Sequence, residues 1–372
     1  KLGGATTDAD EELQYLGVRR PLIEWALRRA AEACPGVTLR GGSRVEGLVV
    51  EAGQLTGAWI DGTSVSADVV VDALGRRSPV AAWLADLGVE VAQLEHSDCG
   101  VVYYSRYYRC RPGVELVDGP WFLSPRGDLG YLAFSTFPGD NGTFAAIFAV
   151  PTGVPEWKAL HDTDGFEAGV LQVPVLAQWV DHERVDPITP VMAMAGLHNS
   201  YRPVSGGAVV FPVGDAYGHT DPVLAHGVPF GLIHAAELAR VLRDHQDLSE
   251  AMADYGAATG PALRERFAFA TALDEQRHRL WVGGEVDFAH HDGDYALFTM
   301  VAGGVAAATD PELARVFLRR IGLLDSTRIL DEDRGLQMRM EASFAKASEV
   351  PRPRLGPSRG DFLAATRESG RD

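Results

Sequence analysis

The fold of this chain is decided by one stretch, Ala208-Val209-Val210-Phe211-Pro212-Val213-Gly214-Asp215-Ala216, in a sequence of 372 residues. Its first half is a short apolar run rich in β-branched residues, which predicts a buried strand. Gly214 then allows a sharp turn and a close approach of the backbone to a ligand. Asp215 follows at the carboxyl end of the strand, so the pattern predicts a strand that presents one free carboxylate.

A helix is predicted soon after this turn, from Val228 to Arg243. Gly227 precedes it, and Pro229 falls in its first turn, where the N–H that proline lacks is not needed. A helix N-terminus offers free N–H groups and a partial positive charge, which suit an anion or an electron-rich ring. A carboxylate that can accept sugar hydroxyls beside a helix end that can support a ring is what a flavin requires.

The segment from this turn to the helix resembles the second FAD signature of the flavoprotein monooxygenases related to para-hydroxybenzoate hydroxylase. That signature reads Gly-Asp-Ala, a spacer, Pro, two residues and Gly-x-Gly. Asp215, Pro222 and Gly227 match it, and Ala225 stands where the signature has its first glycine. The resemblance implies that Asp215 binds the ribityl chain of FAD. It also implies that the helix start at Gly227-Val228 lies against the isoalloxazine.

A second stretch, from Ala67 to Ser78, resembles the middle motif of the same family. It is an apolar strand that ends in Asp72-Ala73-Leu74-Gly75-Arg76-Arg77-Ser78. The resemblance implies that Asp72 and the turn at Gly75 border the cofactor near its pyrophosphate, where the nicotinamide nucleotide approaches.

A third stretch, from Val18 to Ala31, repeats apolar residues at helical spacing. An arginine just before the first turn lies at the positive end of the helix, and a bound phosphate would explain it. The family has a matching arginine on the FAD diphosphate, which implies this role for Arg20, with Arg19 as the alternative. Two solvated surface arginines are the competing interpretation. A strand pair farther along resembles the one whose valine backbone meets the adenine, which indicates Val45.

The Gly-x-Gly-x-x-Gly loop of this family is absent from the sequence, which opens Lys1-Leu2-Gly3-Gly4-Ala5. The glycines of that loop let the backbone reach the pyrophosphate at a helix N-terminus. We therefore expect that the sequence lacks the N-terminal segment that carries the loop.

Composition narrows the class of protein. The chain has 46% hydrophobic residues and a net charge of -17, which disfavours nucleic-acid and anionic-membrane partners. Its three cysteines, Cys34, Cys99 and Cys110, lack metal-ligand spacing and indicate a reducing, cytoplasmic compartment with no metal site. No apolar run approaches the ~18 residues of a membrane span.

The motifs predict an α/β fold in which a Rossmann-like FAD-binding domain of the glutathione-reductase type is interleaved with an antiparallel β-sheet substrate domain. Aromatic, partly alternating residues from 101 to 150 and a hairpin signal at Asp140-Asn141-Gly142 predict that sheet. The expected parts are the FAD-binding domain without its N-terminal strand (1–90), the sheet domain (91–206), the return of the FAD-binding domain (207–245), a C-terminal helical region (246–347) and a flexible or docking tail (348–372).

Two sets of residues are candidates for chemistry. In the family the sheet forms the floor of a pocket that faces the isoalloxazine. Alternation places Tyr104, Arg106 and Tyr108 on one face of a strand, and we take them as substrate-pocket candidates, with core packing as the alternative. His219 and His226 flank the Gly-Asp motif, where each could act as acid or base at neutral pH. A structural histidine at a helix start is the alternative.

The resemblance implies an FAD-dependent monooxygenase that hydroxylates or epoxidises a small organic substrate, aromatic or polycyclic, with oxygen and NADH or NADPH. The electrons come directly from that donor or through a separate flavin reductase. One alternative is a flavin-dependent halogenase, whose Trp-x-Trp-x-Ile-Pro motif is absent and whose catalytic lysine has few counterparts here, namely Lys1, Lys158 and Lys346. The others are a dehydrogenase or reductase of the geranylgeranyl reductase-like type and a catalytically inactive flavoprotein-like fragment.

Overall fold

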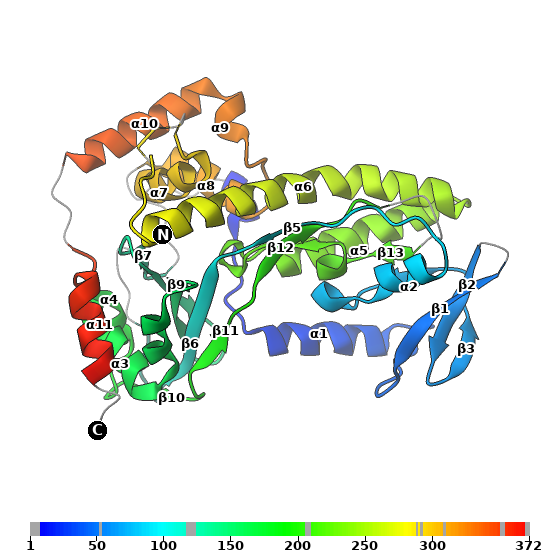
Figure 1. The fold of residues 1–372 in the computed structure, drawn as a ribbon, viewed down its shortest axis with the longest axis horizontal. Helices are drawn as coiled ribbons and strands as arrows, with labels where there is room; N and C mark the ends of the chain where they lie inside the picture. Colours follow the sequence, from blue (N-terminus) through cyan, green and yellow to red (C-terminus); the bar gives the residue numbers. More distant parts are fainter. Residues whose placement is uncertain are drawn as a thin grey trace. The chain divides into compact units, whose positions relative to one another are not determined.

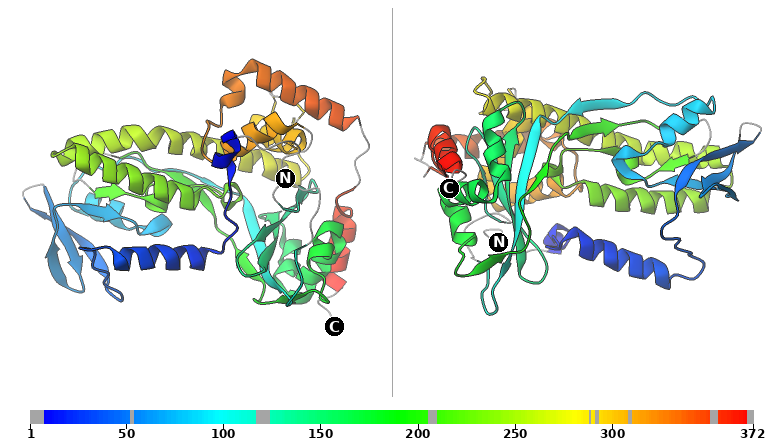
Figure 2. Two further views of the ribbon diagram at one scale, coloured as in Figure 1. Left: turned by 180° about the vertical axis from the view of Figure 1, so that it is seen from behind. Right: turned by 60° about the horizontal axis from the view of Figure 1, so that its bottom comes forward.

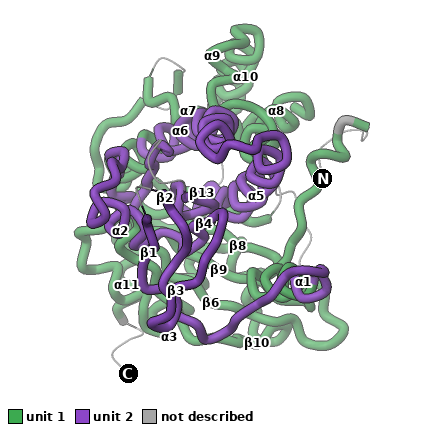
Figure 3. Tube along the Cα trace, turned by 90° about the vertical axis from the view of Figure 1, so that its right-hand side faces the viewer, with its two compact units in different colours: residues 1–29, 100–197, 272–372 green, residues 30–99, 198–271 purple. Residues whose placement is uncertain are grey.

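The computed structural model describes residues 8–51, 54–116, 124–204, 210–287, 289–290, 293–307, 310–349 and 354–368. By packing, the chain divides into two compact units (Figure 3). Unit 1 holds residues 1–29, 100–197 and 272–372, and unit 2 holds residues 30–99 and 198–271. Each unit is therefore assembled from segments far apart in the sequence. The functional domains drawn above from the sequence, with borders at 90, 206 and 245, stay predictions.

Unit 1 is built on an antiparallel sheet with the strand order β10-β6-β9-β8-β7, in which β11 also pairs with β6 (Figure 1). Its strands are β6 (Val101–Cys110), β7 (Arg126–Asp128), β8 (Ala133–Pro138), β9 (Thr143–Pro151), β10 (Val185–Pro187) and β11 (Met192–Met194). The predicted hairpin is confirmed, because β8 and β9 are joined by the turn at Asn141 and Gly142. Both residues have positive φ, 53° and 66°, as a tight hairpin turn of this kind requires.

Helices on this sheet close the main core of unit 1. They are η3 (Pro155–His161), α3 (Thr163–Gln172), α4 (Pro174–Trp179) and α11 (Arg359–Glu368). Phe148 of the sheet is fully buried, with its ring centroid 5.4 Å from that of Phe166 and 5.5 Å from that of Phe362. Burial of such rings is the main source of stability in a core of this type.

Two alternatives were open for the tail from residue 348, a flexible or a docking segment, and the flexible one is wrong for the helix that the structure places near the C-terminus. In Figure 2 this helix, α11, lies against the green helices of unit 1. Phe362 of α11 is fully buried in the aromatic core, and the Tyr131 hydroxyl donates to the Pro357 carbonyl at 2.9 Å. One apolar helix face within a charged stretch is enough to hold this segment against the core.

A second group of helices in unit 1 confirms the predicted C-terminal helical region. It consists of α7 (Tyr295–Ala307), α8 (Pro311–Ile321), α9 (Ile329–Glu332) and α10 (Arg334–Ser348). Phe298, Leu313 and Met340 are buried together in its core. The 3₁₀-helix η1 (Asp8–Leu13) is attached to α8 by an ion pair between Arg315 and Asp10 at 2.6 Å.

Unit 2 contains three small sheets. The first sheet is antiparallel and holds β1 (Val45–Glu51), β2 (Gln54–Ile60) and β3 (Thr63–Ser66). The second is the parallel pair of β4 (Val70–Asp72) and β13 (Val210–Pro212). The third is antiparallel, with β12 (His198–Tyr201) between β14 (Gly218–His219) and β5 (Glu95–Asp98). The helices of unit 2 are α2 (Val80–Asp86), α5 (Gly227–Asp244) and residues 248–271 of α6 (Leu248–Trp281). The helix α1 (Arg20–Ala33) crosses from unit 1 into unit 2 along the chain.

The strand predicted to decide the fold is present as β13, and the first residues of the prediction lie outside the described ranges. β13 pairs in parallel with β4, with Val210 opposite Val70 and Pro212 opposite Asp72. The two motifs that resembled the family thus end at the same edge of one sheet. The predicted fold class is confirmed, with α/β segments interleaved with antiparallel sheet and followed by helices. Within the described ranges, no helix combines the length and the apolar character that crossing a bilayer requires.

Candidate active site

Two glycine turns meet where β4 and β13 end. Gly75 begins the 3₁₀-helix η2 (Gly75–Arg77) with φ at 76°, and Gly214 begins η4 (Gly214–Ala216) with φ at 61°. Glycine adopts this left-handed conformation without the steric penalty that a Cβ brings. A Cβ on Gly75 would lie 4.0 Å from Cβ of Asp215, so the turns are close neighbours.

The turn after β4 is held by the buried carboxylate of Asp72. Its oxygens accept from the Leu74 N–H at 3.0 Å and from the Ser78 hydroxyl at 2.6 Å. The Ser78 N–H donates in turn to the Gly75 carbonyl at 2.9 Å. Asp72 therefore shapes the turn, and it places Arg76 with a guanidinium nitrogen 3.8 Å from a carboxylate oxygen of Asp215.

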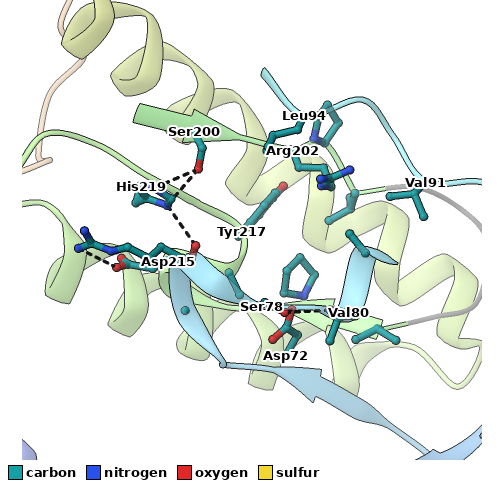
Figure 4. Close-up of a pocket in the computed structure, with 18 of the residues that line it drawn as sticks. Asp72, Ser78, Val80, Val91, Leu94, Ser200, Arg202, Asp215, Tyr217 and His219 are labelled. Atoms are coloured by element: carbon teal, nitrogen blue, oxygen red, sulfur yellow. Dashed lines mark hydrogen bonds and ion pairs between the residues drawn. The ribbon is translucent and has the colours of Figure 1, made fainter. Parts of the chain in front are cut away.

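A cavity of about 420 Å³ opens beside these turns, entirely within unit 2 (Figure 4). Asp215 lines it with its side chain 32% exposed, so the carboxylate is reachable. A Cβ on Gly227, at the start of α5, would lie 3.4 Å from an Asp215 oxygen. The glycine lets the helix start come up to the carboxylate, so the predicted pairing of an acid with a helix N-terminus exists in the structure.

The opposite wall of the cavity comes from the β14-β12-β5 sheet. His96 of β5 pairs with Ser200 of β12, which pairs with His219 of β14. His198 and Arg202 lie two residues to either side of Ser200 and also line the cavity. The sequence analysis missed these residues, although alternation at 198, 200 and 202 could have indicated one exposed face.

His219 is the best-placed candidate for acid–base chemistry in this cavity (Figure 4). Its Nδ1 lies 3.0 Å from the Ser200 hydroxyl and 3.3 Å from the Asp215 carbonyl oxygen. A carbonyl can only accept, so that contact requires the proton on Nδ1 and leaves Nε2 as the basic nitrogen. Burial lowers the pKa of His219, and the Asp215 carbonyl opposes the shift, so the ring is neutral at pH 7.

Two further residues that sequence reasoning missed hold the Gly-Asp turn from below. His234 of α5 is fully buried, and its Nδ1 accepts from the Gly214 N–H at 3.1 Å. The Tyr255 hydroxyl of α6 donates to the Pro212 carbonyl at 2.6 Å. Burial lowers the pKa of His234 to about 4, which keeps the ring neutral and able to accept. In the sequence, these two residues appear only as polar members of otherwise apolar helix faces, and nothing there marks them as partners of the turn.

No family model matches this chain. Protein Rv3254 of Mycobacterium tuberculosis (strain ATCC 25618 / H37Rv) is 26% identical to it over 341 residues, which cover 82% of this chain. The chain spans 66% of the length of that relative.

Similar folds are found among solved structures. The flavin-dependent brominase Bmp2 superposes with a TM-score of 0.57 at 20% identity, over 89% of this chain and 75% of that one. The myxobacterial chondrochloren halogenase CndH gives 0.52 at 17% identity, over 93% and 76%. PqsL of Pseudomonas aeruginosa, a probable FAD-dependent monooxygenase, gives 0.50 at 19% identity, over 70% and 71%. The chain has the fold of FAD-dependent monooxygenases and halogenases.

On this flavoprotein fold, the second-signature residues after Asp215 form a compact entry to α5. Pro222 begins the 3₁₀-helix η5 (Pro222–Leu224), which Asp221 caps by accepting from the Val223 N–H at 2.7 Å. Ala225 adopts φ of 55°, the left-handed conformation. This conformation is easiest for glycine, which explains why the signature has a glycine at this position. Val228 is exposed in the first turn of α5.

His226, the second candidate catalytic histidine, is almost fully buried at the N-terminus of α5. Its ring packs edge-on against Phe230, with centroids 6.0 Å apart. It is absent from the residues that line the cavity, whereas His219 lines it. The structure therefore favours His219 for chemistry and a packing role for His226.

The two arginines predicted to bind phosphate belong to unit 1, whereas the other cofactor candidates belong to unit 2. Arg19 pairs with Asp140: its Nη2 lies 2.5 Å from one carboxylate oxygen, and its backbone N–H donates to the other at 3.0 Å. This contact holds the pKa of Asp140 well below its usual range. Arg20 is the first residue of α1, and its side chain is 82% exposed and pairs with Glu24 at 2.6 Å. Their role toward a phosphate stays a prediction.

The predicted substrate-pocket residues Tyr104, Arg106 and Tyr108 lie in the packed part of unit 1, and their role toward a substrate stays a prediction. Tyr104 and Tyr108 are buried in the aromatic core of unit 1, under the helices. Arg106 pairs with Glu167 of α3 at 2.5 Å, and the Tyr108 hydroxyl donates to the same carboxylate at 2.7 Å. Alternation identified one face of β6 correctly, but which face the helices cover is decided by segments distant in sequence.

Proposed function

We propose that this protein is an FAD-dependent oxidoreductase, and specifically a monooxygenase that hydroxylates or epoxidises a small aromatic or polycyclic substrate with oxygen and NADH or NADPH. The observation that carries the proposal is the Asp215 carboxylate, which reaches a cavity while lying against the start of α5. The fold likeness to FAD-dependent enzymes supports it.

The residues present fit the ribityl and ring end of FAD. Asp215 would accept hydroxyls of the ribityl chain, since its carboxylate is a third exposed and Arg76 lies 3.8 Å away without a close bond. Gly75, Gly214 and Gly227 keep the three adjoining backbone turns free of side chains. The N–H groups at the start of α5 would steady negative charge on the ring. When bound, FAD supplies the activation of oxygen.

The chain itself would supply proton transfer and shielding from water. His219, neutral at pH 7 with its basic Nε2, would take a proton from a hydroxyl of the substrate. Ser200 and the Asp215 carbonyl hold the ring in place. Leu84, Val91 and Val210 give the same cavity an apolar side that suits a ring-bearing substrate.

The proposal is tested by flavin binding to the full chain. FAD added to the purified protein should bind with quenched fluorescence, and Asp215→Ala should weaken that binding at least tenfold, since a hydrogen bond to a charged group contributes ~1.5–3 kcal/mol. Asp186→Ala removes an exposed carboxylate from unit 1 and serves as the matched control. Failure to take up FAD, or equal affinity in the Asp215 variant and the control, would overturn the proposal.

Halogenation is the second candidate, because two of the similar structures belong to a brominase and a halogenase. The positions of the lysines disfavour halogenation, which needs a catalytic lysine. Lys158 and Lys346 are both exposed in unit 1, and Lys1 lies outside the described residues. Bromide or chloride incorporation into product would favour halogenation, and NAD(P)H-dependent oxygen consumption without halide would favour the monooxygenase. A requirement for an added flavin reductase would identify the electron source.

A further inference from the structure

A second hollow of about 600 Å³ lies on unit 2, and the proposed function leaves it unassigned apart from Val45. It is lined by Arg44, Val45, Glu46, Leu74, Arg77, Pro79 and Trp83. It therefore joins the start of β1 to the turn that follows β4 and to the helix α2.

Two consecutive residues of the short helix η2 line the two cavities, one residue in each. Arg76 of η2 lines the first cavity and faces Asp215, while Arg77 lines the hollow. The bonds from Asp72 to Leu74 and Ser78 fix the backbone of this turn on both sides. The Arg77 side chain thus starts from a rigid base.

Arg44 also starts from a fixed backbone. Its N–H donates to the Asp61 carboxylate at 2.9 Å, and its carbonyl accepts from the Asp61 N–H at 3.0 Å. Asp61 occupies the tight turn between β2 and β3, with φ at 49°. The neighbouring Glu46 is partly engaged by the same turn, because its carboxylate accepts from the Gly62 N–H at 2.9 Å.

Neither guanidinium at this hollow forms an ion pair or a side-chain hydrogen bond with any residue that the structure describes. Other arginines of unit 2 do have carboxylate partners, since Arg240 lies 3.0 Å from Asp254 and Arg264 lies 3.5 Å from Glu95. Two arginines with one glutamate leave the hollow with a net positive charge, so an anionic ligand would pair them.

Trp83 adds an aromatic surface to the same hollow. Its indole is half-buried and packs against Leu48, Val80 and Val210 in the small core of unit 2. A ring held in this way keeps its position, and a planar heterocycle can stack on it without ordering a mobile side chain. A flat ring carrying a phosphate satisfies both features.

We propose that this hollow binds the adenosine 2′-phosphate end of NADPH, with the phosphate between Arg44 and Arg77 and the adenine on Trp83. A phosphate monoester carries about −1.5 to −2 charges and three terminal oxygens, which two guanidinium groups can grip together. NADH lacks this group, as does FAD, whose phosphates are both diesters within a bridge. The inference rests on the proposed function and selects NADPH as the electron donor.

The test compares NADP⁺ with NAD⁺, which differ only in the 2′-phosphate, by calorimetric titration of the full chain. NADP⁺ should bind at least tenfold more tightly. Arg44→Gln and Arg77→Gln should each weaken NADP⁺ about tenfold and leave NAD⁺ unchanged, because each removes charge-assisted bonds to the phosphate. Trp83→Leu should weaken both nucleotides by a similar factor. Arg334→Gln, an exposed arginine of unit 1, changes the net charge equally and should change neither affinity.

Equal affinities for NADP⁺ and NAD⁺, or an NADP⁺ affinity that the arginine variants do not alter, would overturn the assignment. Thermal unfolding of each variant checks that the fold is retained. The titration is repeated with saturating FAD, and an unchanged NADP⁺ affinity is expected. Loss of NADP⁺ binding would assign the hollow to the flavin and overturn the proposal. A chain that binds NADP⁺ but takes up no FAD would overturn the proposed function alone.

Discussion

The helix-covered sheet of unit 1 and the turns that follow β4 and β13 in unit 2 hold their charged side chains differently. In unit 1 they are paired closely: Arg106 meets Glu167 under α3, and Arg19 meets Asp140 at the β8–β9 turn, each at 2.5 Å. In unit 2, Arg76 stands 3.8 Å from Asp215, and Arg77 lines a hollow with no carboxylate partner among the described residues. Charges that already have partners stabilise a fold, whereas those held apart remain available to a ligand.

The apolar side chains of these two regions also differ in burial. Phe148, Phe166 and Phe362 are fully buried in unit 1. In unit 2, Val71 of the β4–β13 pair is 44% exposed. We therefore expect stability to depend most on unit 1 and binding to depend most on unit 2. Four changes test this comparison.

The largest effect is expected from Phe148→Ala in the aromatic core of unit 1. Removing a fully buried phenylalanine leaves a cavity among Phe166 and Phe362, and typical losses are ~3–5 kcal/mol. The free energy of unfolding in urea measures it. Phe137→Ala, at an exposed site on the neighbouring strand β8, should change that free energy by less than ~0.5 kcal/mol. Equal losses in the two variants would contradict the location of the core.

The next effect is a pH dependence that originates in unit 2. His234 has a folded-state pKa of about 4, below the ~6.5 of a free histidine, so the unfolded chain takes up the proton first as the pH falls. The contribution of His234 to the free energy of unfolding is complete above pH 6.5 and falls as the pH drops, so that about 3 kcal/mol is lost at pH 4. Urea unfolding at pH 7, 6, 5 and 4 measures this loss.

His234→Gln is the control for that pH dependence. Glutamine keeps an oxygen that can accept from the Gly214 N–H but has no proton to gain in this range. The variant should therefore lose less stability on acidification than the wild type. Parallel pH curves for the two proteins would show that another group causes the loss.

A smaller effect is expected where unit 1 loses a paired charge. Glu167→Gln leaves Arg106, nearly buried, without its carboxylate, and it weakens the bond from the Tyr108 hydroxyl. We expect a loss of about 2 kcal/mol in unfolding free energy. Asp186→Asn breaks the exposed pair with Arg111 and should cost less than ~0.5 kcal/mol. If both variants lose the same, burial does not distinguish the two pairs.

The smallest effect is a gain in unit 2. Ala225 adopts φ of 55°, which costs a residue with a Cβ about 1 kcal/mol relative to glycine. Ala225→Gly should raise the free energy of unfolding by several tenths of a kcal/mol, after the greater freedom of glycine in the unfolded chain is included. Ala268→Gly, at an exposed position in the middle of α6, should instead lower it, by ~1 kcal/mol. A loss at both positions would contradict the left-handed conformation of Ala225.

Features set by neighbours in sequence could be predicted. The hairpin at Asn141-Gly142 and the turn at Gly214-Asp215 follow from residues that tolerate positive φ, and both are present. Which face of β6 is covered and where α11 packs could not be predicted, because Tyr108 and Phe362 belong to one core although more than half of the chain separates them. Likewise, Asp215 was found from its motif, whereas Arg44 shares a hollow with Arg77 only through the tertiary arrangement of unit 2.

The turn from Asp72 to Ser78 keeps the two cavities of unit 2 thermodynamically independent of each other. Asp72 accepts hydrogen bonds on both sides of Arg76 and Arg77, so a ligand that draws Arg76 from Asp215 leaves the backbone that carries Arg77 in place. Linkage is reciprocal, so a ligand that does not change the affinity of the other is itself unaffected by it. The single buried carboxylate of Asp72 would then allow each cavity to fill whether or not the other is occupied.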